Sequence, residues 1–471
     1  MDIDEFRRRG HELIDRIADY WEEIESRPVR AKVKPGEIIA ALPAEAPEGP
    51  ETFDNVLADF DRILDPGLTN WAHPRFFAYF PANISPPAVL GEVLAAGLGQ
   101  QAMLWETSPA ANELEAVTMG WLARATGLPE PFEGTIQDSA STATLCALIA
   151  VRERALEWSG NTDGLSGKPP LTVYASAEAH SSIDKAARIA GFGEKHLRHV
   201  PVDDNFRMIP AELDRMIAED RAAGLQPAGI VASIGATGVG AVDPVADIAA
   251  VSEKHGLYLH VDAAWAGSAL VCPEFRDLSK GIERADSLVF NPHKWLVTNF
   301  DCSAHFVRDP QVLRKALSIL PAYLVSEGST AGPEYRDWTI PLGRRFRALK
   351  LWFALRSYGL EAIRGMIRNH VAWAEELARL VDAAPGFELV APRSLSLVVF
   401  RYCPDGRESE ALDEINDRLI ARVNEAGFTY LTRTLVRGRV AVRFSIGNLM
   451  TERRHVMEAW DHLREVAGTL G

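Results

Sequence analysis

Apolar residues recur at two different spacings along this chain. Near the N-terminus they recur every three or four residues over 2–26, which predicts an amphipathic helix. A Pro-Gly pair at 35–36 follows, so the helix must pack its apolar stripe elsewhere, and a partner subunit is one candidate. Residues 27–105 are rich in proline and aromatic side chains, which predicts irregular structure of the kind that often lines a cleft.

From about residue 106, short apolar runs alternate with helical patterns. Ser108 and Gly127 bracket one predicted helix as cap and stop, and a second helix follows the run of small polar residues near 140. The predicted strands cover 171–176, 228–235, 257–264, 286–291 and 303–308. Apolar strands separated by helices predict βαβ units and a mainly parallel sheet, whose ligands bind at the carboxyl ends of the strands.

The pattern changes again near residue 346. Two long helices (346–358 and 360–383) lead into strands at 394–402 and 438–447, and a closing helix begins near Thr451. We therefore predict an α/β fold in three parts. These are an N-terminal helical segment (1–80) that packs on a partner subunit, a large domain (81–345) and a small C-terminal α/β domain (346–471).

Charge and cysteine content narrow the classes of function. The 471 residues carry a formal net charge of -15, which disfavours binding to nucleic acid or to an anionic membrane. The four cysteines, Cys146, Cys272, Cys302 and Cys403, are far apart and contain no C-x-x-C pair, which favours a reducing compartment. No apolar run is long enough for a membrane helix or a signal peptide, so we expect a cytoplasmic protein.

Lys294 stands in the apolar run "LVFNPHKWLV", a few residues after a predicted strand. Burying an ammonium group is costly unless something neutralises or uses it. A desolvated lysine loses its proton and becomes nucleophilic, so Lys294 is a candidate Schiff-base former.

Three other polar features fall at strand ends or helix starts. Ser139 and Ser141 precede a helix and suit a phosphate cradle, although simple N-capping explains them as well. Asp262 ends a strand and lies on the same face as His260. Its carboxylate is equally suited to binding a ligand, capping a helix or pairing with a buried arginine. His180 follows strand 171–176, where an imidazole can stack on a flat ring, although a lone histidine is more often structural. Together, a lysine, a buried acid, a stacking histidine and a phosphate cradle are what pyridoxal phosphate (PLP) requires.

The motifs also carry a resemblance. "NPHKW", "HPRFFAYFP", "SPAANELE", "SASTATL", "AHSSI", "HVDAAWAG" and "IPLGRRFRALKLWF" occur in the order seen in the PLP-dependent group II decarboxylases of the aromatic L-amino acid type. The chain resembles that family over essentially its whole length. The resemblance implies the aspartate-aminotransferase fold (PLP fold type I), a homodimer with active sites at the interface, and decarboxylation of an aromatic L-amino acid to its amine.

The resemblance also implies a role for each matching residue. Lys294 would hold the cofactor covalently, Asp262 would pair with the pyridine nitrogen, and His180 would stack on the ring. Tyr323, in a mobile loop of this family, would protonate the carbon that loses CO2. The remaining cofactor-binding positions are Ala140, Ser141, Asn291, Ala264 and His293. The substrate-binding positions are Trp71, Tyr79, Phe80, Pro81, Ala82, Met103 and Gly343, of which Met103 and Gly343 would reach across the dimer interface.

Four positions depart from the pattern of the animal enzymes. Ala82 and Asn112 each replace a threonine, Met103 replaces a phenylalanine, and Ala236 stands where a threonine supports the acid on the pyridine side. These departures leave the cofactor chemistry intact and leave the preferred amino acid open among tryptophan, tyrosine, phenylalanine and dihydroxyphenylalanine. Gly343 leaves room for a large ring such as indole.

Other functions are also compatible with the sequence. The nearest is an aromatic aldehyde synthase on the same scaffold, whose members usually lack either the loop tyrosine or the stacking histidine. A transaminase, a scaffold without activity, and a hydrolase with a metal at His255, His260 and Asp262 are further alternatives, although that spacing fits no familiar metal signature.

Overall fold

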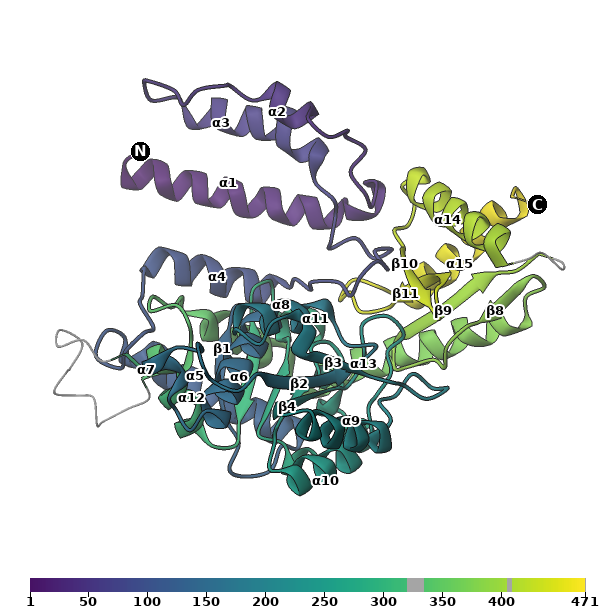
Figure 1. Cartoon of the computed structure of the whole chain (residues 1–471). Helices are drawn as coiled ribbons and strands as arrows, with labels where there is room; N and C mark the ends of the chain where they lie inside the picture. Colours follow the sequence, from purple (N-terminus) through teal and green to yellow (C-terminus); the bar gives the residue numbers. More distant parts are fainter. Residues whose placement is uncertain (320–333, 405–408, 471) are drawn as a thin grey trace. The chain divides into compact units, whose positions relative to one another are not determined.

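The computed structural model describes residues 1–319, 334–404 and 409–470, and it divides the chain into two compact units (Figure 1). The larger unit is Ala82–Glu375 with Ala391–Val398. The smaller unit joins Met1–Pro81 to Glu376–Val390 and Val399–Gly471. The division into three folding domains at 80/81 and 345/346 stays a prediction.

A seven-stranded sheet forms the centre of the larger unit, in the order β1-β7-β6-β5-β4-β2-β3. Its strands are β1 (Glu133–Gln137), β2 (Leu171–Ser176), β3 (Leu197–Val200), β4 (Gln226–Ser233), β5 (Tyr258–Asp262), β6 (Ser287–Phe290) and β7 (Ser303–Val307). Neighbours from β6 to β3 pair in parallel, whereas β7 pairs antiparallel with both β6 and β1. The predicted mainly parallel α/β sheet is therefore confirmed, with an antiparallel pair of strands at one edge.

Helices cover this sheet because its strands are apolar on both faces. Val173, Val231 and Tyr258 pack with Val151 and Ile183 from helices in one buried cluster. The α-helices of this unit are α4 (Pro86–Leu98), α5 (Pro109–Thr126), α6 (Ala140–Ala155), α7 (Gly160–Asp163), α8 (Ser181–Ile189), α9 (Pro210–Ala222), α10 (Val245–His255), α11 (Pro292–Trp295), α12 (Pro310–Leu317) and most of α13 (Arg347–Ala383). Short 3-10 helices cover Glu194–His196, Ala266–Val271, Pro273–Ser279, Ile282–Arg284 and Tyr335–Trp338.

The parallel strands place their following residues at one edge of the sheet. The segments after β2, β4, β5 and β6 begin at residues 177, 234, 263 and 291. Because these four strands run in the same direction, the segments meet at the carboxyl edge, where ligands bind in such sheets. Helix α6 begins beside them, with Ser139 as its N-cap residue.

The smaller unit contains a four-stranded sheet in the order β10-β11-β9-β8. Its strands are β8 (Phe387–Leu389), β9 (Leu397–Tyr402, shared with the larger unit), β10 (Thr432–Val436) and β11 (Arg439–Ser445). Its helices are α1 (Ile3–Glu22), α2 (Glu37–Ala41), α3 (Phe53–Asp59), α14 (Ser409–Ala426) and α15 (Arg453–Gly468), with short turns at Ile24–Ser26, Phe60–Leu64 and Asp65–Gly67. Within this unit the N-terminal segment is tied to the C-terminal one, because the Val29 amide donates to the Gly427 carbonyl at 2.9 Å.

The segment predicted to be irregular, 27–105, contains three α-helices. Its longest, α4, begins at two prolines and buries Ala88 and Gly91. A Cβ atom at Gly91 would lie 2.8 Å from the Lys350 Cα, so this glycine allows close helix packing rather than a turn. The prediction failed because proline and glycine were taken as breakers when they mark a helix start and a contact.

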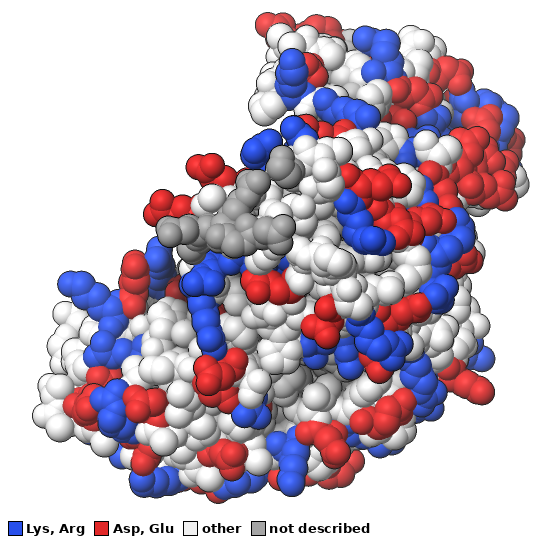
Figure 2. Space-filling view, turned by 90° about the vertical axis from the view of Figure 1, so that its right-hand side faces the viewer, with Lys and Arg blue, Asp and Glu red and all other residues white. Residues whose placement is uncertain are grey.

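The two helices predicted on either side of Gly359 are confirmed, and they share the label α13 across a kink at that residue. Gly359 has a φ of 70°, outside the helical region, which glycine adopts without a steric penalty. Among the described residues no helix has the length and apolar content to cross a membrane. Figure 2 shows how charge is distributed on one face, where Lys and Arg side chains are interspersed with Asp and Glu.

Candidate active site

Lys294 lies in the short helix α11, directly after β6, and lines a pocket at the carboxyl edge of the sheet. Its side chain is half-buried. The Lys294 amide donates to the Asn291 carbonyl at 2.9 Å. The next residue, Trp295, is fully buried and donates its indole N–H to His370 Nδ1 at 2.9 Å, which anchors the helix.

Eight residues predicted from the sequence line this one pocket. They are Ala140, Ser141, His180, Asp262, Ala264, Asn291, His293 and Lys294. They come from four separate segments of the chain and converge because the parallel strands β2, β5 and β6 end at the edge beside which α6 begins. Ser139, Ser182, Ser233, Gly235, Ala236, Thr237, Trp265 and Phe300 complete the lining.

Asp262 ends β5 with its carboxylate facing this pocket, and it is only 8% exposed. One oxygen, Oδ1, accepts the Ala264 amide at 2.9 Å. The hydrogen bonds among the described residues leave Oδ2 available to a donor in the pocket. A buried carboxylate with one free oxygen suits a protonated ring nitrogen, as the sequence predicted for the pyridine of PLP.

His180 is the N-cap residue of α8 and lies beside the same pocket. Its Nδ1 accepts the Ser182 amide at 3.1 Å, which fixes the ring. Burial lowers the pKa of His180, the Asp262 carboxylate opposes this, and the Lys294 ammonium adds to it. The imidazole is therefore neutral at pH 7, which suits stacking on a flat ring.

His293 is held away from acid–base chemistry by its burial. The pKa of its imidazole is lowered to about 3, mainly by desolvation and further by Lys294. Its Nδ1 accepts the Cys302 amide at 3.0 Å, so the proton of the neutral ring is on Nε2. His293 is therefore neutral at pH 7, and its role beside Lys294 stays a prediction.

The N-terminus of α6 provides the anion-binding side of the pocket. Ser139 Oγ accepts the Thr142 amide at 3.1 Å, so Ser139 is the helix cap, as the simpler interpretation predicted. Ala140 and Ser141 line the pocket in the first turn, where the backbone N–H groups of a helix have no partner within it. Asn291 faces the same pocket from the end of β6, and 3% of it is exposed.

The predicted substrate residues are not among those that line this pocket. Trp71, Tyr79, Phe80 and Pro81 belong to the smaller unit, where the Trp71 and Tyr79 rings stack with centroids 5.7 Å apart. Ala82, Met103 and Gly343 belong to the larger unit, and their role in binding stays a prediction. Tyr323 lies outside the described residues.

Two polar residues near Lys294 were missed by the sequence interpretation. Asn83 donates its side-chain amide to the Lys294 carbonyl at 2.5 Å, and its backbone amide donates to the His293 carbonyl at 2.8 Å. Ser85 Oγ donates to the Val297 carbonyl at 2.6 Å. No sequence signal joins these positions, because they lie more than 200 residues from the segment that they hold. Ser182, by contrast, follows His180 at the spacing of a helix cap and was visible in principle.

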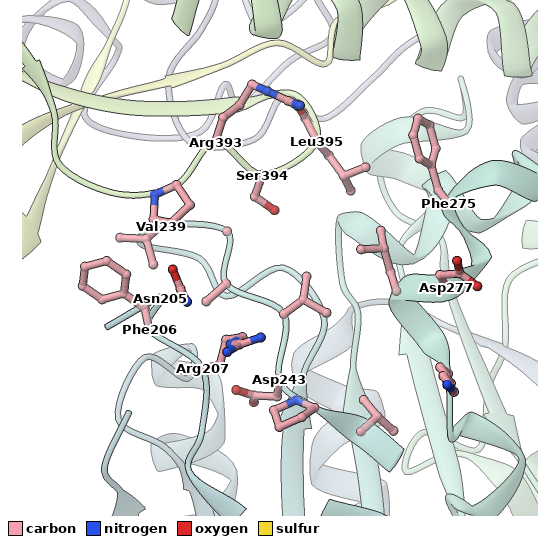
Figure 3. Close-up of a pocket in the computed structure, with 18 of the residues that line it drawn as sticks. Asn205, Phe206, Arg207, Val239, Asp243, Phe275, Asp277, Arg393, Ser394 and Leu395 are labelled. Atoms are coloured by element: carbon pink, nitrogen blue, oxygen red, sulfur yellow. The ribbon is translucent and has the colours of Figure 1, made fainter. Parts of the chain in front are cut away.

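A larger cavity, of about 690 Å³, is lined in part by the segment between β4 and α10 (Figure 3). Its wall includes Phe206 and Asp243, a carboxylate that is 3% exposed. Asp243 accepts the amides of Met208 and Ser233 at 2.7 and 2.8 Å, and burial raises its pKa to about 6. The larger cavity is not the candidate active site. The lysine, the acid, the histidine and the phosphate donors all line the smaller pocket.

The proposed metal triad does not form. His255 Nε2 lies 2.6 Å from Asp214, whereas His260 lies fully buried with its Nδ1 2.7 Å from Ser287 Oγ. These two histidines therefore have separate partners, and only Asp262 of the three faces the pocket.

Comparison with known proteins decides the family. The conserved-domain model described as "Pyridoxal-dependent decarboxylase conserved domain" matches residues 35–403. The chain belongs to the pyridoxal-dependent decarboxylase family. This decarboxylase is 43% identical over 480 residues to phenylacetaldehyde synthase of Arabidopsis thaliana, covering 100% of the chain and 97% of that protein. It is 42% identical over 481 residues to tryptophan decarboxylase TDC2 of Camptotheca acuminata, covering 100% and 96%.

A solved structure agrees with the decarboxylase over its whole length. Oryza sativa TDC, crystallised with PLP and tryptamine, superposes with a TM-score of 0.96 at 37% identity, covering 100% of this chain and 99% of the other. The predicted fold type, cofactor class and carboxy-lyase activity are confirmed by these findings. The cofactor is PLP, and the residues that line the pocket fit it: free helix N–H groups for the phosphate, a carboxylate for the ring nitrogen and a lysine for the aldehyde.

Proposed function

We infer that this enzyme decarboxylates an aromatic L-amino acid to the corresponding amine and CO2. The observation that carries the proposal is that Lys294, Asp262 and His180 line one pocket together with the phosphate donors. The relatives support the substrate class, because their names refer to tryptophan and phenylacetaldehyde and the rice structure holds tryptamine.

Each residue of the pocket is proposed to hold one part of the cofactor. The N–H groups of Ala140 and Ser141 and the amide of Asn291 bind the phosphate, whereas Asp262 Oδ2 accepts a hydrogen bond from the protonated ring nitrogen. His180 stacks on the ring and Ala264 packs near it. When bound, PLP supplies an electron sink for the bond to the departing carboxylate.

The remaining roles concern protons and position. Lys294 Nζ would hold the cofactor covalently in the resting enzyme. Asn83 holds the backbone next to this lysine, because it donates hydrogen bonds to the carbonyls of both Lys294 and His293. Tyr323 is proposed to protonate the carbon that loses CO2, as the family resemblance implies.

The residues proposed to bind the aromatic substrate, as the family resemblance implies, are Trp71, Tyr79, Phe80, Pro81, Ala82, Met103 and Gly343. Aromatic and apolar linings favour a flat side chain over a second carboxylate. Gly343 has open space around it, since the nearest atom to an added Cβ would be Gln101 Oε1 at 3.6 Å. This absence of crowding suits an indole as well as a phenyl ring.

An aromatic aldehyde synthase is the second candidate, and the 43% identity to phenylacetaldehyde synthase favours it. In that reaction the amino acid, O2 and water give the aldehyde, CO2, ammonia and hydrogen peroxide. We place it second because Tyr323 and His180 are both present in this chain, whereas aldehyde-forming members usually lack one of them.

A homodimer is proposed, with helix α4 at its interface. Leu90, Val93, Leu94 and Leu98 on this helix are 45–53% exposed, although the helix is strongly apolar. An exposed apolar helix face of this kind marks a protein contact, and closed twofold dimers are the commonest assembly. We place the dimer in the cytoplasm, which the four free thiols support.

A panel of L-amino acids tests the proposal. The wild-type enzyme is expected to release one CO2 and one amine for each tryptophan, tyrosine, phenylalanine or dihydroxyphenylalanine consumed, and to spare glutamate. Peroxide and ammonia in proportion to CO2 would instead establish the aldehyde synthase. Lys294→Ala is expected to lose both activity and the yellow colour of covalently bound cofactor.

A further inference from the structure

Asn291 is fixed in the pocket wall through its backbone. Its amide N–H donates to the Ala264 carbonyl at 2.8 Å, and its carbonyl accepts the Lys294 amide at 2.9 Å. These bonds join the acid-bearing segment after β5 to the lysine-bearing helix. Because the backbone is fixed, the Asn291 side chain can change its orientation only by rotating about its own bonds.

The two ends of that side chain are not equivalent toward a phosphate. Nδ2 donates hydrogen bonds, whereas Oδ1 only accepts them and would repel a phosphate oxygen. The two orientations differ by half a turn, so some neighbour must select one of them. The neighbour that contacts the Asn291 side chain from outside the pocket lining is Ser303.

Ser303 is the first residue of β7, and it is fully buried. Its Oγ lies 2.6 Å from Asn291 Oδ1, a separation typical of an O–H donor rather than an N–H donor. Ser303 is fixed in turn by the sheet, where it pairs with Gln137 of β1. It is not among the residues that line the pocket, so it reaches a ligand only through Asn291.

We propose that Ser303 is a positioning residue that holds Asn291 with Nδ2 toward the cofactor phosphate by donating its hydroxyl to Oδ1. The proposal rests on the assignment of Asn291 to the phosphate in the proposed function. Without the hydroxyl, Asn291 keeps Nδ2 on the phosphate only by leaving a buried carbonyl oxygen unsatisfied. That loss weakens the phosphate contact and leaves the contacts to the ring and aldehyde unchanged.

Competition between PLP and pyridoxal, which lacks the phosphate, isolates this effect. The full-length holoenzyme is equilibrated with mixtures of the two, the lysine-bound cofactor is fixed by borohydride, and the intact mass gives the fraction that carries phosphate. Ser303→Ala is expected to lower the preference for PLP roughly tenfold. Asn291→Ala should lower it at least as much, and adding Ser303→Ala to Asn291→Ala should lower it no further.

Two further variants keep the test sharp. Ser303→Cys keeps the size of the side chain and replaces the hydroxyl by a weak donor, so it should also lose preference for PLP. Ser252→Ala is the matched control, because Ser252, in helix α10, is also buried, donates to the Leu257 carbonyl at 2.9 Å and lies outside the pocket lining. It should keep the wild-type preference.

Three results would overturn the proposal. These are an unchanged preference in Ser303→Ala and Ser303→Cys, a further loss when Ser303→Ala is added to Asn291→Ala, and a wild-type enzyme that binds pyridoxal as tightly as PLP. Release of CO2 from the amino-acid panel is scored separately on the wild-type enzyme. Its failure would reject the proposed function while leaving the measured phosphate preference intact.

Discussion

Asn83 holds the backbone of Lys294 from a distant part of the chain. Its side-chain N–H donates to the Lys294 carbonyl at 2.5 Å, and its backbone N–H donates to the His293 carbonyl at 2.8 Å. Asn83 is 2% exposed, so these bonds form out of contact with bulk water. The position of the reactive amine therefore depends on two segments that meet only in the folded structure.

Replacing Asn83 with alanine should lower kcat roughly tenfold or more. The substitution leaves the Lys294 carbonyl without this donor in a buried setting and loosens the helix that carries the amine. Steady-state kinetics with the preferred amino acid would show the fall, and cofactor content would show whether Lys294 still binds PLP. Asn205→Ala, at an exposed position, is the control and should keep wild-type kcat. A wild-type kcat in Asn83→Ala would show that the contact is dispensable.

Arg344 and Glu115 form a buried ion pair that should dominate the stability of the segment near Gly343. The guanidinium lies 2.6 Å from the carboxylate, and their side chains are 3% and 1% exposed. Either Arg344→Met or Glu115→Gln should lower the free energy of unfolding by about 3–5 kcal/mol, because each leaves the partner's charge buried without its opposite charge. Denaturant unfolding would measure the loss.

The double variant tests the origin of this loss. Because the second substitution removes the orphaned partner, the double variant should lose less than the sum of the two single losses. Arg215→Met is the control, since the Arg215–Glu219 pair is more than half exposed on both sides and should cost under about 1 kcal/mol. Additive losses at Arg344 and Glu115 would show that the two side chains act independently.

The sheet was predictable where its strands are apolar and buried on both faces. The predicted strand 171–176 coincides with β2, the predicted strand 228–235 overlaps β4, and the predicted strand 257–264 contains β5. Strands β1 and β3 were missed because "EGTIQ" and "LRHV" are short and partly polar, and their stability comes from neighbouring strands. Tertiary pairing, rather than local preference, makes them strands.

The candidate site also contains residues that could be predicted from the sequence and residues that could not. Lys294, Asp262 and His180 could be predicted because parallel strands bring their following residues to one edge, whatever the details of packing. Asn83 and Ser303 could not be predicted, because each acts through a side-chain bond whose partner depends on the exact approach of two segments. No periodic pattern in a sequence indicates how an amide or a carbonyl group is oriented.

Stability should fall in mild acid because His305 is buried in its neutral form. Its side chain is fully buried in β7, neither ring nitrogen has a partner among the described residues, and burial lowers its pKa from 6.5 to about 4. The unfolded chain therefore takes up a proton below pH 6.5 that the folded chain refuses until about pH 4. His305 alone should remove about 2 kcal/mol of stability between roughly pH 7.5 and pH 5.

Denaturant unfolding at those two pH values would measure this contribution. His305→Met should unfold more easily at neutral pH through imperfect packing, yet it should lose about 2 kcal/mol less on acidification than the wild type. His11→Gln, at an exposed position on α1, is the control and should keep the wild-type pH dependence. An unchanged pH dependence in His305→Met would mean that other groups account for the acid sensitivity.

Tyr323→Phe should convert part of the product from amine to aldehyde. In the proposed function Tyr323 gives a proton to the carbon that loses CO2, and without that proton the carbon stays exposed to O2. Aldehyde, ammonia and hydrogen peroxide should then appear in equal amounts, with CO2 release continuing at a reduced rate. Coupled peroxide detection and chromatography of the amine would measure the ratio. Tyr20→Phe, whose hydroxyl lies 2.9 Å from Asn70 in the smaller unit, is the control. If Tyr323→Phe made only amine at the wild-type rate, the proton would have to come from another group.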